Sequence, residues 1–277
     1  METPTGHDRK GLVCIYEFLG QIFFMYIALV SGGTGGDTYG IAAPLALFAI
    51  VNIFGGVSGG HFNPAVTLGV YVREAKWAHN FIFMLMIIAS QIAGALVGML
   101  LAYLALRIQV NGTYDVVNSY VPLLLPSTCT RESIDNNTVV LGENLSTFYM
   151  EVICTFVFVL FILHATGKHT VGPDMGVWGV PAICFVLWAL CQVDAYTGAS
   201  FNPALAIGST FFQSWLYDVN PQNVMTHYLP MYIGGAALGG IFAGVFYNFH
   251  EKLFHCEEDE HHRVTDSSIN PEYMKKH

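Results

Sequence analysis

The sequence predicts an all-α membrane protein with six transmembrane helices and two re-entrant half-helices arranged as an inverted repeat. One observation is compositional. The chain is 53% hydrophobic and only 11% charged, with a mean hydropathy of +0.49, whereas a soluble domain carries about 25% charged residues. The other observation is a repeat, because the motif Asn-Pro-Ala occurs in both SGGHFNPAVTLG at 58–69 and TGASFNPALAIG at 197–208.

Apolar segments recur along the chain at roughly the ~20-residue length that a helix needs to cross a bilayer. The first of them has no small-residue cleavage site and is long for the apolar part of a signal peptide, so we expect it to remain as a span. The six expected spans are Leu12–Val30, Ile41–Val57, Ala78–Leu106, Phe148–Ala165, Val177–Val193 and Tyr228–Asn248.

The distribution of Lys and Arg predicts that both termini are cytoplasmic. With six spans the termini share one side of the membrane, and the opposite side carries only Arg107 and Arg131. The cytoplasmic side carries the other nine basic residues, which are Arg9, Lys10, Arg73, Lys76, Lys168, Lys252, Arg263, Lys275 and Lys276.

Three N-glycosylation sequons support this orientation. They begin at Asn111, Asn136 and Asn144, and all three fall in the long connection 107–147. The predicted topology places this connection outside the cell or in a lumen, where Asn-X-Ser/Thr is an acceptor for glycans. We expect at least one of the three to be modified.

Two carboxyl groups within the spans indicate a duplicated unit. Glu17 lies in the first span and Glu151 in the fourth, at matching positions before the two motifs. A carboxyl at membrane depth is costly and marks a structural or functional site. Each unit contains three spans, an odd number, so the second must insert upside down. This gives inverted repeats over about 12–106 and 148–248.

Each Asn-Pro-Ala motif predicts the start of a helix too short to cross the membrane. Asn is a favoured N-cap and Pro suits the first helical position. The segments Pro64–Val72 and Pro203–Phe212 would form helices of roughly 14 Å. In an inverted pair they enter from opposite sides and their N-termini meet near the midplane. Their loops are tolerated at that depth only beside a watery cavity, so a pore is expected.

The sequence resembles the aquaporin, or major intrinsic protein, family over about residues 12–250. We expect these residues to form the channel domain. A cytoplasmic N-terminal segment, 1–11, would precede it and a cytoplasmic tail, 251–277, would follow it. The resemblance implies the aquaporin fold and a homotetramer with one pore per subunit. The residues that carry it are Glu17-Phe-Leu-Gly, SGGHFNPAVT, Gln91-Ile-Ala-Gly-Ala, Glu151 and YTGASFNPA.

The resemblance also implies roles for individual residues. Asn63 and Asn202, in the motifs Asn63-Pro64-Ala65 and Asn202-Pro203-Ala204, would donate hydrogen bonds to the permeating molecule. Glu17 and Glu151 would accept hydrogen bonds from amides of the re-entrant loops, although they could instead titrate in a proton pathway. His61 either lines the cytoplasmic vestibule and gates with pH or hydrogen-bonds the loop backbone.

One part of the chain departs from the family pattern. Family members form an outer constriction from four positions, which here fall on Ala43, Leu190, Ala199 and Leu205 if no gap intervenes. The family usually has Arg at the last position, and water-selective members have Phe and His at the first two. The continuation Ala-Leu-Ala after the second motif is similar to the unorthodox (superaquaporin) branch, although that branch usually has an altered first motif.

The missing Arg changes the expected selectivity. At ~4 Å and an effective dielectric near 20, a full positive charge would repel a cation by about 4 kcal/mol, and each half-helix N-terminus by roughly half of that. Ala at two positions would also widen the constriction. Glycerol, urea, hydrogen peroxide and ammonia become plausible solutes beside water, unless other side chains refill the space.

Three classes of function remain open on the sequence. The first is a passive channel for water and small neutral solutes in a lipid bilayer. The second is an ion-coupled secondary transporter, against which no acidic residue lies next to either motif. The third is a non-conducting scaffold. The sequence shows no catalytic constellation, no Cys/His spacing for a metal and no basic nucleic-acid-binding region, so we expect neither an enzyme, a cofactor nor a nucleic-acid partner. The membrane could be the plasma membrane or an internal one.

Overall fold

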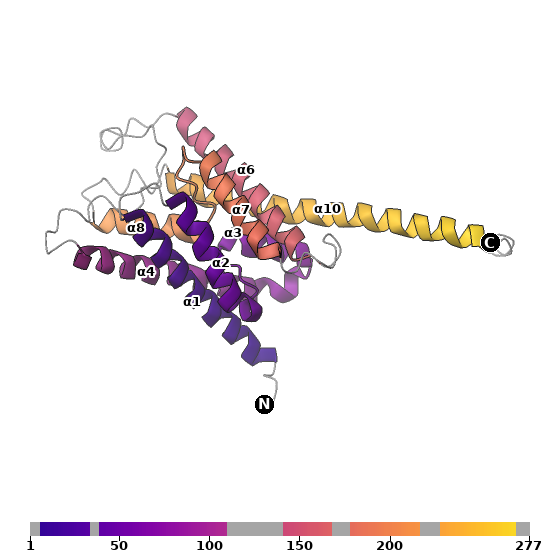
Figure 1. Ribbon diagram of the computed structural model, residues 1–277, viewed down its shortest axis with the longest axis horizontal. Coiled ribbons are helices and arrows are strands. Elements are labelled where there is room, and N and C mark those ends of the chain that lie inside the picture. Colours follow the sequence, from indigo (N-terminus) through magenta and orange to yellow (C-terminus); the bar gives the residue numbers. More distant parts are fainter. Residues whose placement is uncertain (1–5, 34–38, 110–140, 168–177, 217–227, 270–277) are drawn as a thin grey trace.

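The computed structural model describes residues 6–33, 39–109, 141–167, 178–216 and 228–269, and these residues form α-helices and their connections without any strand. The helices are arranged as a bundle from which the C-terminal helix projects (Figure 1). In chain order they are α1 (Gly6–Gly33), α2 (Tyr39–Ser58), α3 (Pro64–Glu74), α4 (Trp77–Gln109), α6 (Leu141–Ala165), α7 (Gly179–Val193), α8 (Pro203–Leu216) and α10 (Leu229–Ile269).

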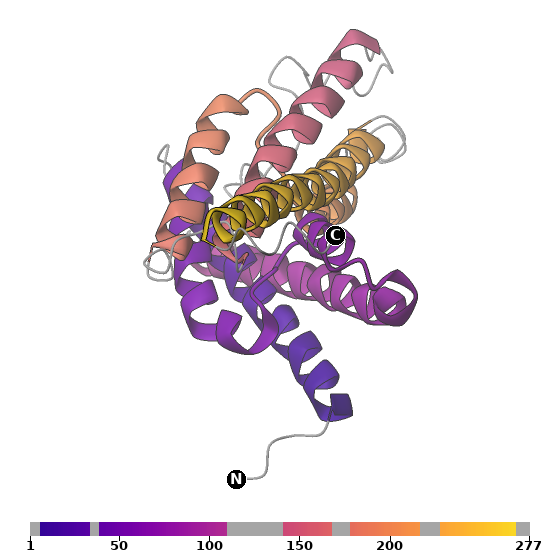
Figure 2. The same cartoon turned by 90° about the vertical axis from the view of Figure 1, so that its right-hand side faces the viewer.

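The bundle consists of two units with the same internal packing. In the first, α1 packs against α2 and α4, and in the second, α6 packs against α7 and α10. The short helices α3 and α8 lie inside, and each of them contacts both α4 and α10 (Figures 1 and 2). The predicted all-α fold, an inverted repeat with one half-helix in each unit, is therefore confirmed.

Glycine allows the long helices of each unit to approach closely. A Cβ added at Gly94 of α4 would lie 2.5 Å from the carbonyl oxygen of Phe18, and one added at Gly239 of α10 would lie 2.6 Å from that of Val152. Side chains would separate these backbones, and small residues are typical of helix contacts in membranes. The two contacts are equivalent, since Phe18 and Val152 each follow the buried glutamate of their unit directly.

The outer surface of the bundle is apolar and its interior contains polar groups, as expected of a chain surrounded by lipid. Ile53, Ile82 and Phe185 are 65–66% exposed, whereas Glu17 and Glu151 are fully buried. Within the described parts of the chain, five helices are long and apolar enough to cross a membrane. The fifth expected span, Val177–Val193, is described only from its second residue, and α7 begins at Gly179 with 15 residues, or about 22 Å.

The last helix is longer than the expected span. We predicted a helix over Tyr228–Asn248 followed by a tail, but α10 continues to Ile269. The reason lies in the local sequence, because no Gly or Pro occurs between Gly244 and Pro271 and the intervening segment contains four residues of the good helix former Glu. Figure 1 shows this continuation projecting from the bundle.

Candidate functional site

Both half-helices begin at the asparagine of an Asn-Pro-Ala motif. Asn63 has extended backbone angles (φ −163°, ψ 121°), and its Oδ1 accepts a hydrogen bond from the amide of Ala65 at 2.8 Å. Asn202 Oδ1 accepts from the amide of Ala204 at 3.0 Å. The proline that follows each asparagine is the first helical residue. The motif therefore starts a helix through local geometry, as the sequence predicts.

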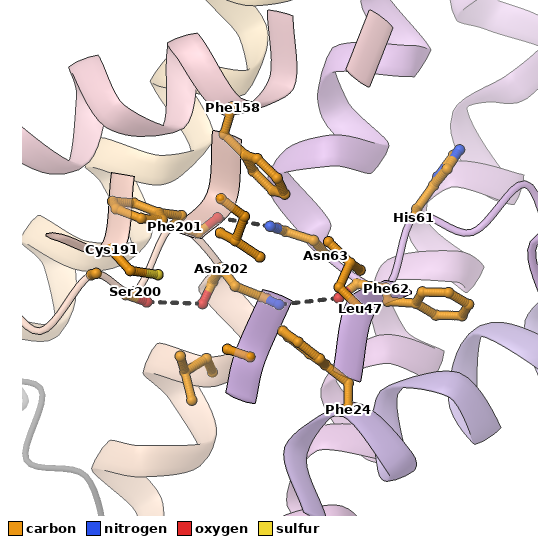
Figure 3. A pocket seen from close by; sticks show the side chains of 14 residues that line it. Phe24, Leu47, His61, Phe62, Asn63, Phe158, Cys191, Ser200, Phe201 and Asn202 are labelled. Atoms are coloured by element: carbon orange, nitrogen blue, oxygen red, sulfur yellow. Dashed lines mark hydrogen bonds between the residues drawn. The ribbon is translucent and has the colours of Figure 1, made fainter. Parts of the chain in front are cut away.

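The two motifs meet through reciprocal hydrogen bonds. The side-chain amide of Asn63 donates to the carbonyl oxygen of Phe201 at 2.7 Å, and that of Asn202 donates to the carbonyl oxygen of Phe62 at 3.0 Å (Figure 3). An amide nitrogen carries two hydrogens, so each asparagine has a second N–H beyond this bond. The N-termini of α3 and α8 are thereby held together in the interior of the bundle.

A buried glutamate from the first helix of each unit holds each loop. Glu17 accepts from the amides of His61 and Phe62, at 3.0 and 2.7 Å. Glu151 accepts in the same way from the amides of Ser200 and Phe201, at 3.1 and 2.9 Å. Each carboxylate uses both oxygens, which satisfies two amides that would otherwise be buried without partners.

The residue before each asparagine has an unusual backbone conformation. Phe62 and Phe201 have φ angles of 44° and 48°, in the left-handed region that is uncommon for bulky side chains. Each of these two residues donates its backbone N–H to the glutamate of its unit, and its carbonyl oxygen accepts a hydrogen bond from the asparagine of the other unit. The strained turn therefore directs both polar groups of the residue to their partners, and these bonds hold it in place.

The two re-entrant loops differ in the side chains that hydrogen-bond around each glutamate. In the first unit, Gln91 of α4 donates to Glu17 at 2.8 Å and to the Thr67 hydroxyl at 2.9 Å. In the second unit, Thr197 donates to Glu151 at 3.3 Å, and the hydroxyl of Tyr232 donates to the Thr197 carbonyl at 2.6 Å. The pair of glutamates is repeated, whereas the residues around them have diverged.

A small cavity of about 30 Å³ lies beside the paired asparagines (Figure 3). A single water needs about 10–15 Å³ measured in this way, so the cavity holds roughly two waters. Its wall is mainly apolar. The lining residues are Phe24, Ala43, Leu47, His61, Phe62, Asn63, Phe158, Leu187, Cys191, Ala199, Ser200, Phe201, Asn202 and Leu205.

Three of the four expected constriction residues, Ala43, Ala199 and Leu205, line this cavity, but Leu190 does not. From α7 the lining residues are instead Leu187 and Cys191. These two are four residues apart and share one face of the helix, whereas Leu190 is rotated away from Cys191 by about 100°. The prediction of Leu190 assumes that no gap precedes the second motif. A turn after α7 that is one residue shorter or longer would change which residue of α7 faces the cavity.

Two aromatic residues of the cavity wall were missed by sequence reasoning. Phe24 lies seven residues after Glu17, and Phe158 lies seven residues after Glu151. Residues separated by two helical turns share a face, so both rings point to the same side of their helices as the glutamates. This spacing could have identified them.

A second, larger cavity of about 400 Å³ lies between α1, α3, α4 and α6. Arg73 and Glu74 line it, and Arg73 donates to the Thr166 hydroxyl at 2.9 Å. His61 lines both cavities and therefore stands between them. Its Nδ1 lies 3.2 Å from the Thr67 hydroxyl, a contact with a side chain and not with the loop backbone.

One of the expected glycosylation sites, Asn144, lies within α6 and is only 8% exposed. A glycan needs an exposed loop side chain, so Asn144 is a poor acceptor. The helices on either side also shorten the connection 107–147, because α4 ends at Gln109 and α6 begins at Leu141. Asn111 and Asn136 lie outside the described residues.

Apolar helices around two half-helices whose N-termini meet at a cavity define an inverted-repeat membrane transport protein. The sequence model of the major intrinsic protein family matches residues 10–247, and the chain belongs to this family. It is a membrane channel for water or small solutes and not an enzyme.

Individual relatives agree with this assignment. The chain is 30% identical to a probable TIP-type aquaporin of Antirrhinum majus over 220 residues, covering 77% of this chain and 73% of the relative. It is 29% identical to the glycerol uptake facilitator protein-like 6 of Lactiplantibacillus plantarum, covering 74% and 89%. The aquaglyceroporin structure from Plasmodium falciparum superposes with a TM-score of 0.66 at 20% identity, over 86% of this chain and 96% of the other. The similarity to the superaquaporin branch stays a prediction.

Proposed function

We propose that this chain forms a passive channel for water and for the small neutral solutes glycerol, urea, hydrogen peroxide and ammonia, with one pore in each subunit of a homotetramer. The observation that carries the proposal is the composition of the wall of the small cavity beside the paired asparagines. Ala43, Ala199 and Leu205 line it, and among the described residues of its wall none is Lys, Arg, Asp or Glu. A solute at this point meets no fixed charge from these side chains.

The paired half-helices supply the selectivity against cations in this proposal. The N-termini of α3 and α8 meet at Asn63 and Asn202, and each carries about half a positive charge. Together they would repel a cation at ~4 Å by about 4 kcal/mol at an effective dielectric near 20. The remaining N–H of each asparagine can donate to the oxygen of a passing water, which leaves that water no acceptor for relaying a proton.

In the proposed pathway, His61 lies where the two cavities adjoin, because it lines both of them. With both termini cytoplasmic, the larger cavity is the cytoplasmic vestibule, since its lining includes Arg73 and Glu74 at the end of α3. A solute would leave the asparagine pair past the imidazole of His61, which is anchored by Thr67. His61 is thus a vestibule residue in the proposal.

The test is solute flux in liposomes that contain the purified protein. Stopped-flow measurements of water, glycerol and hydrogen peroxide should show rapid flux without saturation. A saturable flux that depends on an ion gradient would indicate a secondary transporter, and no flux above that of empty liposomes would indicate a scaffold.

A pair of variants distinguishes flux through the pore from leakage at the protein surface. Ala43→Trp fills the cavity, because Ala43 lines it and is 6% exposed. Leu45→Trp adds an indole on the outer face of the same helix, where Leu45 is 60% exposed. We expect the first variant to abolish flux of all solutes and the second to conduct like the original protein.

A further inference from the structure

We propose that Asp194 and Glu151 form a proton-binding pair beside the second re-entrant loop and hold one proton between them at neutral pH. Loss of this proton weakens the loop and reduces conduction. Asp194 is thus a positioning residue that acts on the pore through Glu151. The effect on conduction rests on the proposed function, whereas the effect on stability does not.

Asp194 is a buried carboxyl group without a hydrogen bond to its side chain. It is fully buried at the C-terminus of α7, where its backbone N–H donates to the Leu190 carbonyl at 2.9 Å. Neither carboxyl oxygen has a hydrogen-bond partner among the described residues. Burial without donors disfavours the ionised form, and so does the negative end of the helix dipole. The protonated form of Asp194 is therefore favoured.

Thr197 links Asp194 to Glu151. Its hydroxyl donates to the Glu151 carboxylate at 3.3 Å, and its backbone N–H donates to the Asp194 carbonyl oxygen at 3.2 Å. The two carboxyl groups are near enough for their charges to interact. Two negative charges in a buried site repel each other strongly, and a single proton held by the pair removes this repulsion.

The donors around the pair decide which carboxyl holds the proton. Glu151 accepts from the amides of Ser200 and Phe201 and from the Thr197 hydroxyl, and these three donors stabilise its ionised form. No such donor reaches the Asp194 carboxyl within the described residues. The negative charge therefore resides on Glu151 and the proton on Asp194, and the pair titrates as a unit.

The neighbouring groups do not neutralise a second negative charge. Cys154 of α6 and Cys191 of α7 lie within electrostatic range of Asp194, and the Tyr232 hydroxyl of α10 donates to the Thr197 carbonyl at 2.6 Å. Thiols and phenols are uncharged at neutral pH. Among the described residues, the groups that act on the two carboxyls include no Lys or Arg. Binding a proton is therefore how this pair reduces its charge.

The first unit has an amide where the second unit has this acid. Gln91 donates to Glu17 at 2.8 Å. In α10 the equivalent place, counted from the matching glycines Gly94 and Gly239, holds Ala236. The first loop thus depends on a neutral side chain that does not titrate, whereas the second loop lies beside one that does. We expect pH to act on the second loop and not on the first.

The second loop connects the pair to the pore. Glu151 holds the amide of Phe201, and the next residue, Asn202, donates across the repeat to the first loop. Cys191, three residues before Asp194, lines the small cavity beside the asparagines (Figure 3). Repulsion between the two carboxyls after loss of the proton would disturb these contacts, so conduction falls as the pH rises.

The pair also fixes the direction in which stability depends on pH. The folded protein holds the proton more tightly than the unfolded chain, in which an Asp side chain has a pKa of about 3.9. The contribution of the pair to stability is therefore highest in acid and falls as the pH rises above about 4, until the proton is lost. Asp194→Asn keeps a neutral side chain of similar shape and removes this dependence.

The experiment measures thermal unfolding in detergent and water permeability of proteoliposomes at mildly acidic, neutral and alkaline pH. We expect the original protein to melt at a lower temperature and to conduct water severalfold more slowly at alkaline pH. Asp194→Asn should melt a few degrees above the original protein at alkaline pH, and its permeability should not change with pH. Glu251→Gln is the control, because Glu251 accepts from the Tyr247 hydroxyl on α10 and lines neither cavity. It should keep the pH profile of the original protein.

Gln91→Glu is the reciprocal variant. It places a second carboxyl beside Glu17, so the first loop should also become sensitive to alkaline pH in melting temperature and in flux. If Asp194→Asn assembles poorly, this variant and the pH profile of the original protein still decide, and flat profiles in both would overturn the proposal.

A lower melting temperature of Asp194→Asn at every pH, with the pH dependence of the original protein intact, would also overturn the proposal, because it would show that the ionised form of Asp194 stabilises the fold. Failure of the original protein to conduct water at any pH would instead overturn the proposed function. The melting temperatures would then still test the proton-binding pair.

Discussion

Asn63 and Asn202 each donate a side-chain hydrogen bond to the carbonyl oxygen of the residue that precedes the other, at 2.7 and 3.0 Å. The same side chains cap the half-helices through their oxygens. Each asparagine thus uses its oxygen locally and its nitrogen across the repeat. This division of roles leads to a prediction about which part of the amide matters for conduction.

Asn202→Asp should separate the capping role from the donor role. A carboxylate can still accept from Ala204, but it cannot donate to the Phe62 carbonyl, and its charge offsets the positive ends of α3 and α8. We expect a loss of about 1–3 kcal/mol in the free energy of unfolding and a rise in proton or cation leak. A pH-sensitive dye enclosed in proteoliposomes measures the leak.

Asn52→Asp is the matched control for this variant, since the Asn52 side chain is exposed and donates within its own helix, to the Phe48 carbonyl at 2.7 Å. It should not change proton flux. If Asn202→Asp remained as proton-tight as the original protein, the role of the amide donors in proton exclusion would be wrong.

Glu151→Gln should destabilise the second re-entrant loop. Both carboxylate oxygens accept backbone N–H groups from Ser200 and Phe201, and an amide nitrogen in place of one oxygen would face a donor with a donor. We expect about 1–3 kcal/mol lower stability and reduced flux, and Glu17→Gln should behave alike. Thermal unfolding in detergent measures the effect, with the exposed Glu74→Gln as the control. Equal melting temperatures for Glu151→Gln and Glu74→Gln would contradict the prediction.

Leu205→Arg should restore the family's charge at the outer constriction. Leu205 lines the cavity and is 5% exposed, so a guanidinium there would narrow the pore and present five donors. The insertion cost of an Arg at membrane depth is roughly 2.5–3.5 kcal/mol, and we therefore expect less protein. Glycerol and peroxide flux should fall more than water flux. Leu205→Met controls for packing, and an unchanged glycerol to water ratio in the Arg variant would show that Leu205 lies outside the permeation path.

Glycosylation provides a test of the topology. If the connection between α4 and α6 is extracellular or lumenal, glycosidase treatment of protein from its native membrane should increase its mobility on a gel. Asn111→Gln combined with Asn136→Gln should abolish this shift, whereas Asn144→Gln should preserve it, because Asn144 is buried in α6. A shift that depended on Asn144 would contradict its described position.

The sequence alone determined the features that depend on local chemistry and composition. The apolar segments specify long helices, and each Asn-Pro-Ala motif specifies a helix start, because capping involves only residues two positions apart. The duplication of the motif and of Glu17 and Glu151 was also sufficient to predict the inverted repeat, since it follows from counting spans. These inferences required no knowledge of how distant helices pack.

Only the tertiary structure decided which side chains surround the cavity. A shift of one residue turns a helical position by about 100°, so Cys191 lines the cavity while Leu190 does not. The presence of Phe24 and Phe158, which belong to separate units, in the wall of one cavity is likewise a consequence of how the two units pack together. The width of a pore depends on side chains that converge from many helices, and their convergence is fixed by long-range packing, which no local pattern in the sequence encodes.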